Sequence, residues 1–279
     1  MWTEPVDLEQ RNLFYGVGGP DDVPDPAAHY MFLSHKTTGF SEGYDVEDAQ
    51  GRKWSVKLGA EAQPEPVVSR LVWAVGFHQP PTYYLPHWAL VQKGLLTSEK
   101  AGRFRLDVPK VKKAGLWAWD QNPFVGTPPL KGLYVLMVMV DNWDLKTDNN
   151  EAYQLKSEQE GASRWFVVKD LGASFGANRP LIHGTRNDLH GFEKEPFITA
   201  VKGNRVEFGH FHGAWKDQNI TPADVLWISE RLARLSPEQW KDAFRAGGYS
   251  ESDSDRFIAR LRQKVADGLA LRQQPGTGD

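Results

Sequence analysis

The sequence predicts a two-lobed α+β fold, with a small antiparallel-sheet lobe first and a mostly helical lobe after it. Three observations lead to this prediction. Strand-like runs separated by turns occupy residues 29–58, the middle of the chain mixes strand and helix signals, and residues 221–271 have helical periodicity. Strands followed by helices are typical of α+β proteins, in which the two kinds of element are segregated.

Within the first lobe, expected over residues 29–85, each strand-like run is short and is followed by a turn signal. A helix is predicted at 65–76, where valine and leucine recur at helical spacing and Gly76 suits the end. Ahead of the lobe, residues 1–28 are rich in proline, glycine and aspartate and predict an irregular arm. The strands are expected at 30–33, 39–46 and 53–57.

The second lobe is expected over residues 86–279. A linker followed by an irregular insertion is assigned to residues 80–131, so most of this segment belongs to the second lobe. The apolar run at 133–140 fits a buried helix or a buried strand, and its periodicity does not separate the two. Two strands, at 152–155 and 164–169, are predicted to pair around a polar loop. Three helices end the chain, beginning at Thr221-Pro222, at Ser236-Pro237 and near residue 253, because a cap residue before proline starts a helix.

Composition is that of an ordinary globular protein. Of the 279 residues, 40% are hydrophobic and 25% are charged, which is enough for a sizeable core. A formal net charge of −3 offers no basic excess for a nucleic-acid partner, and the absence of cysteine excludes disulfides and thiol nucleophiles. The start of the chain lacks a signal-peptide pattern, and no run approaches the ~20 apolar residues of a transmembrane segment, so we expect a cytoplasmic protein.

Residues suited to phosphoryl transfer occur in three short motifs. This chemistry needs a cation on the phosphates, metal ligands and a carboxylate that orients the attacking hydroxyl. The first motif, WSVK, ends at Lys57 on a predicted strand. The second, DLKTDN, runs from Asp144 to Asn149 directly after the apolar run, and the third is DLG, which begins at Asp170 after a predicted strand.

Taken in order, these motifs resemble those of the protein-kinase-like superfamily. DLKTDN is similar to the kinase catalytic loop, with the same spacing of five positions between Asp and Asn. DLG resembles the Asp-Phe-Gly motif with leucine for phenylalanine, and WSVK resembles the strand motif Val-Ala-Ile-Lys. The resemblance covers roughly residues 30–175 and implies an ATP-dependent kinase that uses ATP and magnesium.

By this resemblance, Asp144 is the catalytic aspartate and Lys146 its catalytic-loop neighbour, while Asn149 and Asp170 are metal ligands. The acceptor is expected to be a hydroxyl on a protein, lipid or sugar that the sequence does not identify. The motif order alone therefore implies the reaction type without the substrate.

For nucleotide binding, the resemblance implies that Lys57 holds the phosphates and pairs with a glutamate. Glu65, at the start of the predicted helix, and Glu61 are the two candidates for this partner. Gly39 and Gly43 are expected in a turn over the phosphates.

Several departures point to the atypical branch of the superfamily, which includes the HipA-like and phosphatidylinositol kinases. Asn142-Trp143 replaces the usual His-Arg before the catalytic aspartate, the glycine turn has two glycines, and no Ala-Pro-Glu follows Asp170. These departures motivate one alternative, a catalytically inactive pseudokinase or scaffold. The second alternative is a glycan-binding protein with a surface of Trp88, Trp117 and Trp119.

Acceptor recognition is expected to involve the segment that follows Asp170. This segment is rich in glycine and polar residues, and we expect Arg186 to contact a phosphate or an anionic acceptor. The alternative is that Arg186 braces the turn by pairing with Asp188 or Glu193.

Overall fold

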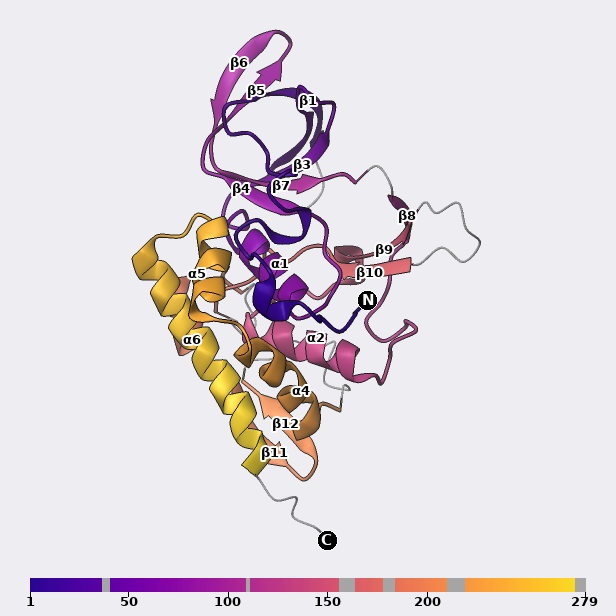
Figure 1. The fold of residues 1–279 in the computed structure, drawn as a ribbon, viewed down its shortest axis with the longest axis vertical. Coiled ribbons are helices and arrows are strands. Elements are labelled where there is room, and N and C mark those ends of the chain that lie inside the picture. Colours follow the sequence, from indigo (N-terminus) through magenta and orange to yellow (C-terminus); the bar gives the residue numbers. More distant parts are fainter. Residues whose placement is uncertain (37–40, 109–110, 156–163, 178–183, 210–218, 274–279) are drawn as a thin grey trace.

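The fold consists of a sheet-rich lobe and a mostly helical lobe (Figure 1). A computed structural model of the chain describes residues 1–36, 41–108, 111–155, 164–177, 184–209 and 219–273. The two-lobed α+β fold class predicted from the sequence is confirmed. None of the described helices is long and apolar enough to cross a membrane.

The first lobe is built on a seven-stranded sheet with the order β4-β7-β3-β2-β1-β5-β6. Every neighbouring pair is antiparallel except β1 and β5, which are parallel. The strands are β1 His29–Lys36, β2 Gly43–Glu47, β3 Lys53–Leu58, β4 Thr82–Leu85, β5 Trp88–Gln92, β6 Leu95–Glu99 and β7 Gly102–Leu106.

The linker and irregular insertion expected at residues 80–131 are wrong over residues 82–106, because β4 to β7 complete this sheet. The sheet therefore extends to Leu106, past the boundary expected at residue 85. The strands are only four or five residues long, and the β5–β6 turn uses left-handed backbone at Lys93 and Gly94. Each strand is so short that its alternation did not outweigh the proline- and glycine-rich composition of the segment, although Trp88 and Phe104 are buried beneath the sheet.

The two faces of the sheet differ sharply in chemistry. Because successive side chains of a strand point to opposite faces, one face of β3 and β7 carries Trp54, Val56 and Phe104, which are buried in the core of this lobe. The opposite face carries the polar residues in between, and it faces the second lobe.

The second lobe is built around α2 (Pro128–Met139), which resolves the apolar run as a helix. The helix is buried on nearly all sides, which explains why its hydrophobic pattern has no distinct face. It shares one core with α1 (Pro64–Ala74) of the first lobe and with the terminal helices. Those helices are α4 Pro222–Ala233, α5 Pro237–Ala246 and α6 Glu251–Ala270, with the short α3 Leu189–Lys194 before them.

Capping explains where the terminal helices begin. Thr221 and Ser236 each form a capping box with the third residue of the following helix, and proline occupies the first turn in both. The N-terminal arm contains 3₁₀ turns at Leu8–Gln10 and Gly16–Gly18. It packs against the second lobe, where the Gln239 side-chain amide donates to the carbonyl of Leu8.

Two small sheets complete the second lobe. β9 (Asn150–Leu155) and β10 (Arg164–Val168) form the predicted antiparallel pair, and β8 (Val111–Gly115) adds to the free side of β9. A hairpin of β11 (Ile198–Lys202) and β12 (Arg205–Phe208) lies close to α4 (Figure 1). The first of these sheets brings the ends of β9 and β10 to the cleft between the lobes.

Candidate active site

A cavity of about 1030 Å³ lies between the polar face of the seven-stranded sheet and the sheet β8–β10. Of the predicted site residues, Lys57, Gly43, Asp144, Lys146, Asn149 and Asp170 line it. Glu65 lies behind Lys57, buried in α1, and Gly39 lies outside the described residues. The structure thus brings Lys57 and Asp170, which are 113 positions apart in the sequence, into contact.

Lys57 is the centre of an ion-pair cluster. Its Nζ lies 2.8 Å from Asp170 Oδ1, 3.1 Å from Glu61 Oε2 and 3.4 Å from Glu65 Oε2. Both candidate glutamates therefore pair with the lysine. Burial lowers the pKa of the Lys57 ammonium, but these carboxylates outweigh it and leave the pKa above its usual value. Lys57 is consequently a fixed positive charge at the cavity wall.

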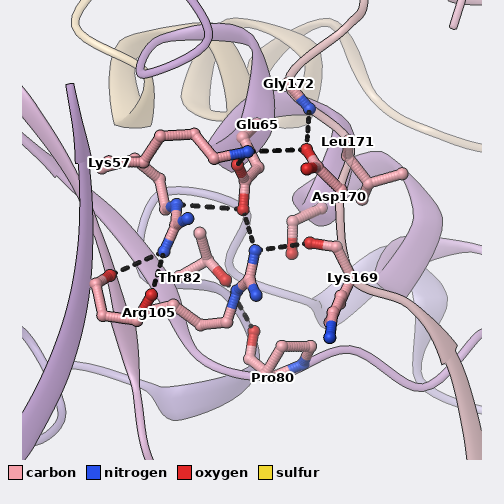
Figure 2. Close-up of polar contacts among 12 residues, drawn as sticks. Lys57, Glu65, Pro80, Thr82, Arg105, Lys169, Asp170, Leu171 and Gly172 are labelled. Carbon is pink, nitrogen blue, oxygen red and sulfur yellow. Dashed lines mark hydrogen bonds and ion pairs between the residues drawn. The ribbon is translucent and has the colours of Figure 1, made fainter. Parts of the chain in front are cut away.

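Glu65 is held by two arginines as well as by Lys57 (Figure 2). Arg103 Nε lies 3.0 Å from Glu65 Oε1, and Arg105 contacts the same oxygen while also donating to the carbonyl of Lys169. Burial raises the pKa of Glu65, but the three cations outweigh it and hold the pKa far below its usual range. Glu65 is therefore ionised, and Arg105 joins it to the residue before Asp170.

The two arginines were not predicted as site residues. They lie two positions apart on β7 and so point to the same face of the sheet. The run GRFRL carried the signal, because its alternation of arginine with apolar residues is typical of a strand with one polar face. The expected irregular insertion at 80–131 obscured it.

Backbone hydrogen bonds connect the DLKTDN motif to the DLG motif. The carbonyl of Asn149 accepts from the amides of Lys169 at 2.9 Å and Asp170 at 3.4 Å. The side-chain amide of Asn149 donates to the carbonyl of Asp144 at 2.6 Å, which closes the loop on itself. The positions of Asn149 and Asp170 are thereby fixed relative to each other.

Asn142, two positions before Asp144, has a structural role. The Asn142 amide donates to Ser174 Oγ at 3.1 Å, and its oxygen accepts from the backbone of Asp144 at 3.2 Å. Asn142 therefore links the loop carrying Asp144 to the segment after Asp170. The Asp144 carboxylate is itself 2.7 Å from Lys146 Nζ, whose side chain is 67% exposed.

Arg186 makes two contacts that the sequence did not indicate. Its Nε lies 2.7 Å from Glu61 Oε1, and its guanidinium stacks over the ring of Trp143, 4.8 Å from the centroid. Glu61 is therefore an ion-pair partner of Arg186 that the sequence did not indicate. Arg186 lines the cavity, and it connects Glu61, in the turn before α1, to Trp143, the residue before Asp144. Its contact with a substrate anion stays a prediction.

The tryptophan surface of the glycan-binding alternative is absent. Trp88, Trp117 and Trp119 are 2%, 3% and 5% exposed, so none presents a ring to solvent. Trp117 donates its indole N–H to the carbonyl of Val167 in the core. The large tryptophan content therefore serves packing at these positions.

The residues present fit a divalent cation that is shared with a phosphate ligand. Both protein contacts of Asp170 use Oδ1, and Asn149 uses its amide nitrogen within the loop, so each offers an oxygen donor. In the described part of the chain, no group of three or more His, Cys, Asp or Glu residues is arranged as a metal site. A cation held by one carboxylate and one amide oxygen obtains its remaining ligands from phosphate and water.

Comparisons with known proteins give matches among solved structures. No family model matches the sequence, and no curated protein sequence matches it. The chain is similar to the Helicobacter pylori proinflammatory kinase CtkA, at 11% identity and a TM-score of 0.49, over 87% of this chain and 97% of that one. It is similar to the Golgi casein kinase with Mn/ADP bound, at 8% identity and a TM-score of 0.47, over 91% and 75%. A second structure of that kinase gives 9% identity and a TM-score of 0.45, over 99% and 79%.

Proposed function

We propose that the protein is a kinase that transfers the γ-phosphoryl group of a nucleoside triphosphate such as ATP to a hydroxyl acceptor. One observation carries the proposal. The Lys57 ammonium lies 2.8 Å from Asp170, whose amide bonds to the carbonyl of Asn149, and the Asn149 side chain holds the backbone of Asp144. A phosphate cation, two oxygen ligands and a loop carboxylate are therefore joined around one cavity, which is the set that phosphoryl transfer needs.

Each residue has a defined task in this reaction. Lys57 holds the donor phosphates, and Glu61 and Glu65 hold Lys57. Asp144 orients the acceptor hydroxyl and receives its proton, while Lys146 Nζ, 2.7 Å from Asp144, offsets negative charge on the transferred group. The acceptor oxygen forms a bond to the γ-phosphorus, the bond from that phosphorus to the β-phosphate oxygen breaks, and the nucleoside diphosphate leaves.

The proposal includes a magnesium ion held by Asp170 and Asn149. When bound, the ion neutralises charge on the β- and γ-phosphates. Asp170 would contact two cations in this arrangement, because its Oδ1 also lies 2.8 Å from Lys57 Nζ. Asparagine at position 149 contributes an oxygen without adding charge.

Transfer of label from γ-³²P-ATP tests the proposal, with the protein itself and a pooled set of protein, lipid and sugar acceptors as targets. We expect magnesium-dependent transfer or hydrolysis by the natural sequence and its loss in Lys57→Met. Asp120→Asn, an exposed carboxylate outside the cavity, is the control and should keep full activity. Magnesium-dependent nucleotide binding without any turnover would support the pseudokinase alternative instead.

A further inference from the structure

Glu61 is a buried carboxylate that contacts two cations of the cavity. It lies in the turn before α1, and its two oxygens face different partners. Oε2 lies 3.1 Å from the Lys57 ammonium and accepts a hydrogen bond from the Ser41 hydroxyl at 3.0 Å. Oε1 lies 2.7 Å from Arg186 Nε. In the described part of the chain, Lys57 and Arg186 are therefore the cations that contact Glu61.

Close packing fixes Glu61 against the segment that follows Asp170. A side chain at Gly172 would place its Cβ 2.6 Å from the Cβ of Glu61, so the glycine of the DLG motif permits this approach. Arg186 is held from its other side, because its guanidinium lies over the ring of Trp143, 4.8 Å from the centroid. Both side chains of the ion pair are at most 10% exposed. The pair is therefore a fixed contact and differs from exposed ion pairs, which contribute little.

The balance of charge around Lys57 gives this pair a consequence for the donor site. The single ammonium faces three carboxylates, those of Asp170 and of both glutamates. Glu65 is also offset by two arginines of β7, and Asp170 is the proposed magnesium ligand. Glu61 has Arg186 as its second cation. A carboxylate without such a cation would hold the ammonium against incoming phosphates, because attraction between partly buried charges is weakly screened.

We propose that Arg186 is a positioning residue that keeps Lys57 available to the donor phosphates by neutralising Glu61. With Arg186 in place, Glu61 shares its charge between two cations, and the ammonium can turn to phosphate. Without Arg186, the carboxylate competes with the phosphates for Lys57. Arg186 then acts on the donor site through Glu61, and this role needs no contact with the acceptor. The inference rests on the proposed function, because Lys57 is the phosphate-binding residue of that reaction.

Calorimetry of magnesium-ADP binding to the full chain tests the proposal. Arg186→Gln removes the charge but keeps a planar amide near Trp143, and the Kd should rise by about fivefold or more, the lower end of coupling between interacting sites. Arg186→Lys keeps the charge and loses the stacking, so its Kd should stay within about threefold of the natural value. Arg245→Gln is the matched control and should leave the Kd unchanged. Arg245 also pairs with a carboxylate, Asp242 at 2.7 Å, and lies over a ring, Phe14 at 4.6 Å, but outside the cavity.

Glu61→Gln provides the measurement that a merely structural role of Arg186 would not move. The double variant Glu61→Gln/Arg186→Gln should bind magnesium-ADP within about twofold of Glu61→Gln, because no carboxylate of this pair remains to compete for Lys57. A loss of affinity between these two variants as large as the fivefold expected for Arg186→Gln alone overturns the inference, because Arg186 then acts without Glu61. This comparison also decides the matter if Arg186→Gln does not fold, since the double variant leaves neither charge of the pair unmatched.

The failure of this inference and the failure of the proposed function are distinguishable. If the natural chain binds magnesium-ADP, Lys57→Met abolishes that binding, and folded Arg186→Gln binds with unchanged Kd, the function stands and the positioning role is wrong. If the natural chain binds neither magnesium-ADP nor magnesium-ATP and transfers no phosphate, the proposed function is wrong and this inference with it.

Discussion

Lys264 on α6 makes a buried connection to the loop that carries Asp144. Its side chain is 0% exposed, and its Nζ lies 2.7 Å from Asp141 Oδ2 and 2.9 Å from the carbonyl of Met139 at the end of α2. The ammonium also sits over the ring of Phe192, 4.3 Å from the centroid. Replacing Lys264 by methionine keeps most of the volume but leaves Asp141 buried without its cation.

The expected cost of Lys264→Met is about 3–5 kcal/mol of unfolding free energy, the range for breaking a buried pair from one side. Burial raises the pKa of Asp141 to about 6 even though Lys264 lowers it, so removing the lysine should raise that pKa further. A carboxyl with a raised folded pKa destabilises the protein when ionised. The cost should therefore be smaller at pH 5.5 than at pH 8, because protonation relieves the unpaired charge.

Urea unfolding at these two pH values measures the cost, and turnover per folded molecule measures the effect on the loop. The double variant Lys264→Met/Asp141→Asn should recover much of the stability, because neither charge remains. Arg262→Met, an exposed neighbour on α6, is the matched control and should change stability by less than about 0.5 kcal/mol. A loss as small for Lys264→Met as for the control, or a loss equal at both pH values, would refute the reasoning.

Three further predictions concern the cleft and its surroundings. Arg105→Lys keeps the positive charge but removes the guanidinium that donates to the carbonyl of Lys169. The unfolding free energy should fall by about 1.5–3 kcal/mol, and the KM for magnesium nucleotide should rise. An unchanged KM contradicts this role. Arg186→Ala should lower kcat by removing the stacking on Trp143, with about 0.5–2 kcal/mol of stability lost, and kinetics at saturating acceptor check it. Burial lowers the pKa of His78 from its usual 6.5 to about 4. The folded protein should therefore lose about 3 kcal/mol of unfolding free energy as the pH falls from 6.5 toward 4. His78→Gln should make the unfolding free energy less dependent on pH over this range, as measured by urea titration.

The sequence was sufficient where local chemistry determines the structure. Thr221 and Ser236 cap the helices that follow them, each with proline at the first helical position, and the strand that carries Lys57 shows clear alternation. The resemblance to kinase motifs implied that Asp144, Asn149 and Lys57 lie around one site. All three line the same cavity, and their roles are still predictions.

Features that depend on long-range pairing were not predictable in the same way. β5 lies beside β1 in parallel, a partnership between residues about 60 positions apart that leaves no local pattern. The partner of Arg186 is likewise distant, because Glu61 precedes it by more than 120 positions. The sequence could not decide whether Glu61 or Glu65 pairs with Lys57, because both carboxylates contact its ammonium in the structure.

The central claim is that Lys57, Asp144, Asn149 and Asp170 act together in phosphoryl transfer. Its most direct test is the separation of binding from turnover in two matched variants, with calorimetry for magnesium-ATP affinity and product formation for kcat. Asp144→Asn should bind magnesium-ATP with affinity within a fewfold of the natural chain and lose turnover by about 10²-fold or more, because only the group that acts on the hydroxyl is changed. Asp170→Asn should lose magnesium-dependent binding and turnover together. Full turnover in both folded variants would contradict the account.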